Sequence, residues 1–317
     1  MIPGMMRRVR VGGGLFVASA AAVVWAYGMT VLEPLTEPGS PWHDESVGNN
    51  TYWAREIRWG AILAAVAALI VVVDGNRRRS AYLGGGAVAW LGVDLLVDRV
   101  DLHAGALWPT ALTAVAAVTL AAVRPSGDGG RRALTTAMVL CAATAPAAAI
   151  IQSPTDGESA LVSARLTVAA LLGVTALLCA FAAAPALSWA RVGAGTALGT
   201  GVWAALVAGH GSLTVSWLAG SCLIAGTWLA GREWRGVTTA AVGVLGTVVA
   251  YPLLGMMVVF VSWQAGKPFT ALAGNPPVNG ADTDLILILV GVLTGAGFTA
   301  FPPLARRLEA SAVNPAR

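Results

Sequence analysis

Three aspartates share one face of an otherwise apolar stretch of this chain. Trp90 is followed by Asp94, Asp98 and Asp101, at positions i+4, i+8 and i+11. At about 100° per residue, this spacing places the four side chains on one stripe of a helix. A carboxylate at membrane depth costs about 2.5–3.5 kcal/mol on insertion scales and usually marks a functional site. Asp94, predicted to lie deepest, is therefore the first candidate catalytic residue.

Asp94 is the carboxyl group that we expect to carry a proton near neutral pH. Burial and neighbouring like charges both favour the neutral form of an acid. Asp98 is expected near the membrane interface and Asp101 in or near water. A buried, protonated carboxyl can serve as a general acid in an enzyme or as the proton carrier of a transporter. The alternative is a structural ion pair with a nearby arginine, for which the sequence offers Arg55, Arg58 and Arg99.

A second polar cluster occupies the stretch TYWAREIRW at residues 51–59. Tyr52, Glu56 and Trp59 lie there on one helical face, at i, i+4 and i+7. The cluster also contains Trp53, Arg55 and Arg58. This segment leads into the second predicted span, which a short basic loop joins to the third span, the one that carries the aspartates. We therefore expect the two spans to be neighbours, with Glu56 near the depth of Asp98. Glu56 and Asp98 are thus the candidates for a second catalytic carboxylate.

Aromatic side chains are predicted to gather at the same level as these acids. An aromatic-lined cavity would suit an apolar or cationic ligand, because the faces of the rings attract positive charge. The alternative for each residue alone is an aromatic belt at the membrane interface. The predicted substrate-binding residues are Tyr27, Tyr52, Trp53, Trp90, Trp108 and Trp263.

The elements that must position these residues are membrane-spanning helices. The chain of 317 residues is 56% hydrophobic and 11% charged, with a mean hydropathy of +0.71, whereas soluble domains carry about 25% charged residues. Continuous apolar runs of about 20 residues indicate helices rather than barrel strands. We predict an all-α helix bundle with ten spans, at 12–32, 59–74, 81–98, 104–123, 133–152, 164–184, 192–210, 213–230, 236–262 and 284–304. The seventh and eighth could instead form one re-entrant hairpin.

The charges give this bundle a predicted orientation. With ten spans, 15 of the 20 Lys and Arg residues fall on one side, which should be the cytoplasmic side. We therefore expect a multi-pass protein of a bacterial-type cell membrane with both termini in the cytoplasm. The chain would be a single transmembrane domain, 1–317. Its two long outer loops, 33–58 and 263–283, are possible lids.

Two functions fit these patterns. The favoured hypothesis is a membrane enzyme acting on a lipophilic isoprenoid, as a terpene cyclase in which Asp94 starts the reaction by protonation and aromatic faces stabilise carbocations. The alternative is a proton- or cation-coupled transporter or permease with Asp94 as the coupling carboxylate. A non-catalytic membrane subunit is a weaker third possibility. Expected partners are a lipophilic small molecule and membrane lipid, not nucleic acid, with no metal or cofactor; the sequence does not indicate the oligomeric state.

Overall fold

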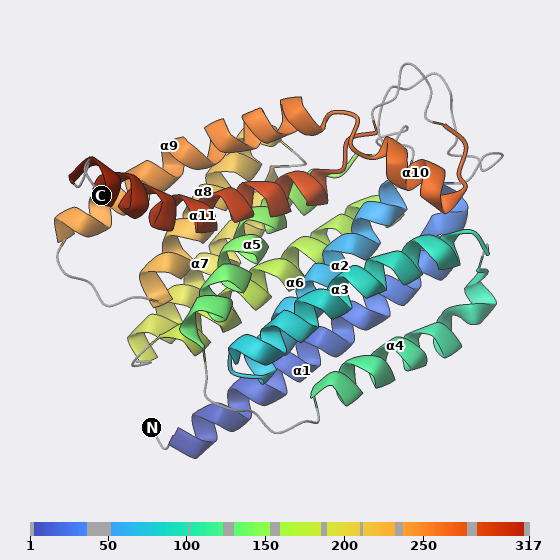
Figure 1. Ribbon diagram of the computed structural model, residues 1–317. Helices are drawn as coiled ribbons and strands as arrows, with labels where there is room; N and C mark the ends of the chain where they lie inside the picture. The colour runs from blue at the N-terminus through green and yellow to red at the C-terminus, as the bar shows by residue number, and fades with distance from the viewer. Residues whose placement is uncertain are drawn as a thin grey trace.

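The computed structural model describes residues 3–36, 52–100, 102–122, 130–152, 159–184, 189–209, 212–231, 237–277 and 284–313. Every regular element in these residues is helical, which confirms the all-α prediction (Figure 1). The α-helices are α1 Pro3–Tyr27, α2 Trp53–Val72, α3 Arg77–Asp98, α4 Leu107–Ala122, α5 Arg131–Ala148, α6 Ser159–Ala183, α7 Trp189–Ala208, α8 Leu213–Gly231, α9 Val237–Ser262, α10 Lys267–Ala273 and α11 Leu287–Val313. A π-helix, Gly28–Leu32, and a 3-10 turn, Glu33–Leu35, extend α1, and a second 3-10 turn, Ala104–Ala106, precedes α4.

Several of these helices are compatible with a membrane protein. By length and hydropathy, five stretches of the described chain could cross a bilayer: Arg7–Leu35, Arg77–Asp98, Ala104–Ala122, Ser159–Ala183 and Leu245–Ser262. The longer helices of the described chain overlap the ten predicted segments, but the number of spans and the cytoplasmic location of both termini stay predictions. The seventh and eighth segments form two helices, α7 and α8, that pack against each other.

The second helix begins earlier than the sequence predicted. It starts at Trp53, so the charged residues of its first turns are helical and buried rather than part of an outer loop. Their side chains are bonded inside the bundle, which lets the helix continue past them. Of the two predicted outer loops, 37–51 and 278–283 lie outside the described residues. The rest of the second loop contains the short helix α10.

Helix α2 is at the centre of the bundle. It packs against α1, α3, α5 and α6, and every residue in it except Leu63 and Ile70 is buried. Small residues permit this close packing. A Cβ atom at Gly60 would lie 2.4 Å from Val168 of α6. One at Gly14 would lie 2.8 Å from Val72.

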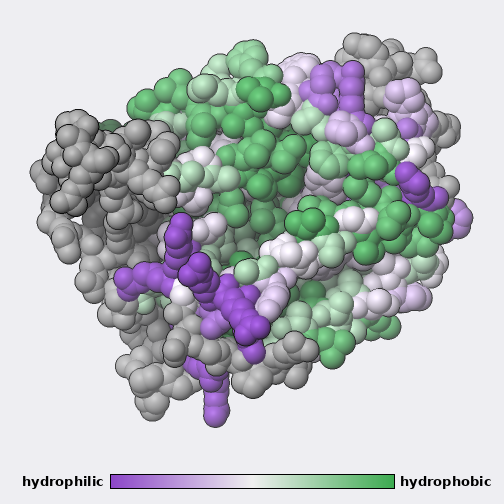
Figure 2. All heavy atoms as spheres, viewed as in Figure 1, coloured by the Kyte–Doolittle hydropathy of each residue, from purple (hydrophilic) through white to green (hydrophobic). Residues whose placement is uncertain are grey.

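Helix α3 has the opposite character, because it buries its acids and exposes its apolar side chains. All 22 of its residues are described, and Asp94 and Asp98 are the two that are buried. Val88 is 70% exposed and Leu96 is 63% exposed. Apolar side chains spread over the face that α3 and α4 occupy, while hydrophilic ones gather near the N-terminal ends of α1 and α3 (Figure 2). Such an outward apolar face is compatible with a membrane environment. The inner face of this peripheral helix combines the two buried acids with partly buried apolar residues such as Leu91 and Leu95.

Candidate functional site

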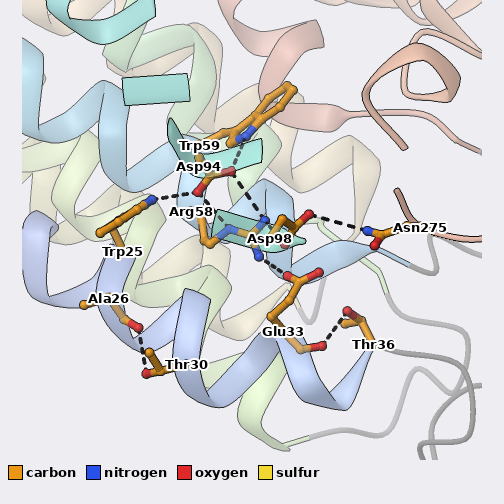
Figure 3. Close-up of polar contacts among 10 residues, drawn as sticks. All are labelled: Trp25, Ala26, Thr30, Glu33, Thr36, Arg58, Trp59, Asp94, Asp98 and Asn275. Carbon is orange, nitrogen blue, oxygen red and sulfur yellow. Dashed lines mark hydrogen bonds and ion pairs between the residues drawn. The ribbon is translucent and has the colours of Figure 1, made fainter. Parts of the chain in front are cut away.

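Arg58 of α2 is the centre of a buried ion cluster at the end of α3 (Figure 3). Its Nε donates to Asp94 Oδ1 at 2.9 Å and its Nη2 is 3.4 Å from Asp94 Oδ2. Nη2 also donates to Asp98 Oδ1 at 2.8 Å, and Nη1 donates to Glu33 Oε2. The guanidinium is fully buried, and all three of its nitrogens meet carboxylates. We call Glu33, Arg58, Asp94 and Asp98 the Arg58 cluster.

Asp94 receives hydrogen bonds from every side. Besides Arg58, the indole nitrogens of Trp25 and Trp59 donate to its two oxygens at 2.7 and 3.0 Å. All of these partners are donors, which is the arrangement that suits an ionised carboxylate rather than a carboxylic acid. The geometry therefore provides the structural ion pair that the sequence left open as an alternative. A role for Asp94 as a proton donor stays a prediction.

The end of α1 is shaped to admit this cluster. The π-helix Gly28–Leu32 carries the chain over Arg58 and brings Glu33 onto its guanidinium. A Cβ atom at Gly28 would lie 2.7 Å from Arg58 Cγ, so only glycine leaves room for the arginine stem. One turn earlier, Trp25 stacks edge-on against Trp90 of α3, with ring centroids 5.5 Å apart. The α1 segment thus contributes a carboxylate and an indole to a site otherwise built by α2 and α3.

Acids outnumber bases in the Arg58 cluster. Three buried carboxylates surround one guanidinium, and an uncompensated buried charge costs several kcal/mol. A retained proton or a bound cation would reduce that cost. Among the described residues, no group of three or more His, Cys, Asp or Glu side chains is arranged to hold a metal ion. The cluster therefore has one guanidinium against three carboxyl groups, an excess of acids over bases.

The predicted second carboxylates have different surroundings. Asp98 belongs to the cluster, and its Oδ2 also accepts a long hydrogen bond, 3.4 Å, from Asn275 Nδ2. Glu56 lies toward α11, where its Oε2 accepts a hydrogen bond from Ile288 N at 2.9 Å. The ion pairs of Arg58 go to the three cluster acids and not to Glu56. Asp101 lies outside the described residues.

The six predicted aromatic residues do not converge on one cavity. Trp90 lines a groove between α3 and α4, whereas Tyr27 and Trp108 line a separate hollow of about 460 Å³ between α1, α4 and α6. Tyr52 and Trp53 are buried at the start of α2, and Tyr52 Oη donates to Pro276 O at 2.7 Å. Trp263, at the end of α9, is 47% exposed.

Sequence reasoning missed three members of the site. Trp25 stood in an apolar run without a polar neighbour, and Glu33 fell in the predicted outer loop 33–58 without an individual role. Trp59 was placed on the helical face of Glu56, but not on Asp94. The π-helix, which redirects the chain toward Arg58, leaves no clear trace in the sequence.

The groove between α3 and α4 is an extensive apolar hollow beside the cluster. It has a volume of about 640 Å³, and α1 and α2 form its floor through Trp25, Val66 and Leu69. Along α3 it runs from Val97 to Leu83, about 21 Å at a rise of 1.5 Å per residue. One side of Trp25 faces this groove while its indole nitrogen binds Asp94. Trp25 is therefore the direct link between the groove and the ion cluster.

A second polar group lies next to the cluster, under α10. Arg55 Nη1 donates to Thr270 Oγ1 at 2.9 Å, and this hydroxyl donates to Asp284 Oδ2 at 3.0 Å. Phe269 packs edge-on against Trp59, with ring centroids 4.9 Å apart. Burial raises the pKa of the Asp284 carboxyl above its ordinary value, although the Thr270 hydrogen bond and the charges of Arg55 and Lys267 oppose the rise. The segment around α10 thus covers the start of α2.

The arrangement of these groups is the basis for any functional assignment. Comparison of the chain with protein-family models, with curated proteins and with solved structures finds no match.

Proposed function

We propose that this protein is a membrane-embedded enzyme that acts on a lipophilic isoprenoid held in the groove between α3 and α4. The best-supported reaction is a cyclisation started by protonation, as in a terpene cyclase. The observation that carries the proposal is the dual position of Trp25. Its ring forms part of the groove wall, and its Nε1 donates to Asp94 Oδ1 at 2.7 Å.

The groove has the dimensions and lining that such a substrate requires. Its length of about 21 Å along α3 suits an extended polyprenyl chain, and its residues are almost all apolar. Trp25 and Trp90 present two aromatic rings within it. Aromatic faces stabilise a passing carbocation through the ring quadrupole.

The Arg58 cluster supplies the acid in this proposal. Its three carboxyl groups share one guanidinium, so two of their negative charges have no cation within the cluster. A proton held by the cluster would offset one of these charges. Asp94 does not line the groove itself but is bonded to the groove wall through Trp25. We assign proton delivery to Asp94 by direct contact with the substrate, which requires the Trp25 ring to move aside, because an indole N–H cannot relay a proton. The donors that surround Asp94 then stabilise the carboxylate left after transfer.

Product analysis tests the proposal directly. The chain is expressed in a host that supplies polyprenyl substrates, and lipid extracts are searched for cyclised products by mass spectrometry. Asp94→Asn should abolish these products, whereas Asp284→Asn, which removes a buried acid outside the cluster, should retain them. Full product formation by the Asp94 variant would disprove the assignment.

A variant in the groove separates chemistry from folding. Trp90→Phe keeps an aromatic ring in the wall and should retain product, whereas Trp90→Leu keeps an apolar side chain without a ring and should lose it. Gel filtration in detergent checks that both variants fold. Equal product from the two would show that the ring face has no catalytic part.

Proton-coupled transport is the second candidate, and the excess of acids over bases in the Arg58 cluster favours it. A cluster that holds a proton at depth can couple proton movement to a substrate. Uptake into proteoliposomes driven by a pH gradient would test this function. Asp94→Asn should uncouple uptake from the gradient, and uptake that remains fully proton-driven in this variant would exclude Asp94 as the coupling carboxylate.

A further inference from the structure

Arg55 is a buried cation whose hydrogen bonds are incomplete. Its side chain is 1% exposed, its Nη1 binds Thr270, and its guanidinium lies 5.0 Å from the centre of the Tyr52 ring. Nε and Nη2 have no hydrogen-bond partner among the described residues. A buried charged group left without partners costs more free energy than a neutral one. Some group is therefore expected to fill this position in the protein.

The two unpartnered atoms form the bidentate edge of the guanidinium. Nε–H and one Nη–H of arginine point in parallel, and this fork matches the two oxygens of a carboxylate or phosphate. Arg58, one helical turn later, shows the same edge in use. Its Nε and Nη2 face the two oxygens of Asp94, at 2.9 and 3.4 Å. We call the corresponding edge of Arg55, its Nε and Nη2, the Arg55 fork.

No nearby acid of the described chain pairs with the Arg55 fork. Asp284 is close enough to interact with Arg55 electrostatically, but its Oδ2 accepts the hydroxyl of Thr270 and makes no hydrogen bond to Nε or Nη2. Lys267 adds a second positive charge to the same surroundings. The local charge therefore favours an incoming anion.

We propose that the Arg55 fork is an oxyanion-binding subsite under α10, which takes a phosphate or carboxylate group. The group could belong to a lipid head group or to a free anion. Neither Arg55 nor Thr270 lines the groove between α3 and α4. The subsite is therefore separate from the proposed substrate groove and does not depend on the proposed reaction.

Anion titration of the purified chain tests the subsite. The protein is purified in a phosphate-free maltoside detergent, and its Tm is followed by tryptophan fluorescence while inorganic phosphate, or acetate, replaces chloride at constant ionic strength. At an anion concentration about one hundred times its Kd, the Tm should rise on the order of 5 °C. A wild-type Tm that responds to neither anion, together with no bound lipid, would overturn the proposal.

Variants assign the response to Arg55. Arg55→Lys keeps the charge but removes the fork, so this variant and Arg55→Gln should lose the shift. Arg99→Gln is the matched control, because Arg99 is exposed at the same end and uses its Nε and Nη2 on the carbonyl of Leu272. A shift that persists in the Arg55 variants, or disappears in all three, contradicts the proposal.

Two further measurements distinguish the ligand source and guard against misfolding. Native mass spectrometry of protein extracted with its lipids should show a phospholipid lost in Arg55→Gln but kept in Arg99→Gln if the source is a head group. If the ligand is instead a free anion, the Tm should respond to the added anion although no lipid is bound. Asp284→Asn keeps this neighbouring side chain uncharged at every pH, so it should tighten phosphate binding several-fold at a pH at which the wild-type carboxyl is ionised. Unchanged affinity in this variant would place the anion elsewhere.

Discussion

Two arginines of α2, one helical turn apart and equally buried, have contrasting surroundings. Arg58 faces α1 and α3 and meets three carboxylates. Arg55 faces α10 and meets one hydroxyl. The difference comes from α3, a helix with exposed apolar side chains whose two buried residues are acids. A buried arginine in a helix bundle thus holds helices together where a neighbouring helix supplies carboxylates. Where no neighbouring helix supplies a carboxylate, it is available to bind an anion.

The largest effect on stability should come from replacing Arg58. Arg58→Gln leaves three buried acids without their cation, and breaking a buried ion pair in this way costs about 3–5 kcal/mol. We expect a Tm well below that of the wild type, measured by tryptophan fluorescence in detergent. Arg99→Gln, at an exposed arginine, is the control and should unfold near the wild-type temperature. Equal Tm values for the two variants would show that the cluster adds nothing to stability.

Asp94→Asn should have the next largest effect, because it removes one charge but preserves the shape of the side chain. An amide at this position accepts hydrogen bonds through one oxygen instead of two, so part of the present set of donors loses its acceptor, at a cost of about 2–3 kcal/mol. Amide hydrogen exchange should rise in α3 and not in α6. Asp98→Asn should disturb α3 less, since Asp98 binds Arg58 through one oxygen. Greater exchange in the Asp98 variant would reverse this ranking.

Single indole substitutions should have smaller effects. Trp25→Phe and Trp59→Phe each remove one hydrogen bond to Asp94 and keep a ring, at a cost of about 1–2 kcal/mol each. Because both bonds converge on one carboxylate, the double variant should deviate from the sum of the two single losses. A double-mutant cycle on thermal stability measures that deviation. Simple additivity would mean that the two indoles act independently.

The smallest effect on stability concerns the surroundings of Arg55 and their response to pH. Burial raises the pKa of Asp284 above its ordinary value, so folding favours its neutral form. The stability that this form contributes is present below the ordinary aspartate pKa and is lost as pH rises through the raised value. Asp284→Asn should remain uncharged and flatten this decline in the free energy of unfolding. A decline as steep as that of the wild type would exclude Asp284 as its source.

Composition and periodicity were sufficient to predict the all-α class and the common stripe of Asp94 and Asp98. Both depend on local spacing, which a helix converts directly into geometry. The hydrogen-bond partners of Asp94 could not be predicted in this way, because they depend on the path of the chain between helices. The π-helix at Gly28–Leu32 brings Glu33 to Arg58 just after Trp25 has reached Asp94, and no periodic pattern encodes it. The sequence offered three arginines as partners without a reason to choose among them.

Glu56 and Ile288 have a consequence for the biosynthesis of the protein. The carboxylate of α2 accepts the backbone N–H of Ile288 in the first turn of α11, 232 positions later in the chain. A negative charge at this point also stabilises the positive end of the helix dipole. Helix α11 is synthesised after α2, α5 and α9, the helices that it packs against, so its contact with Glu56 can form only once α11 has left the ribosome. This late segment therefore completes its part of the bundle by closing back onto one of the earliest helices.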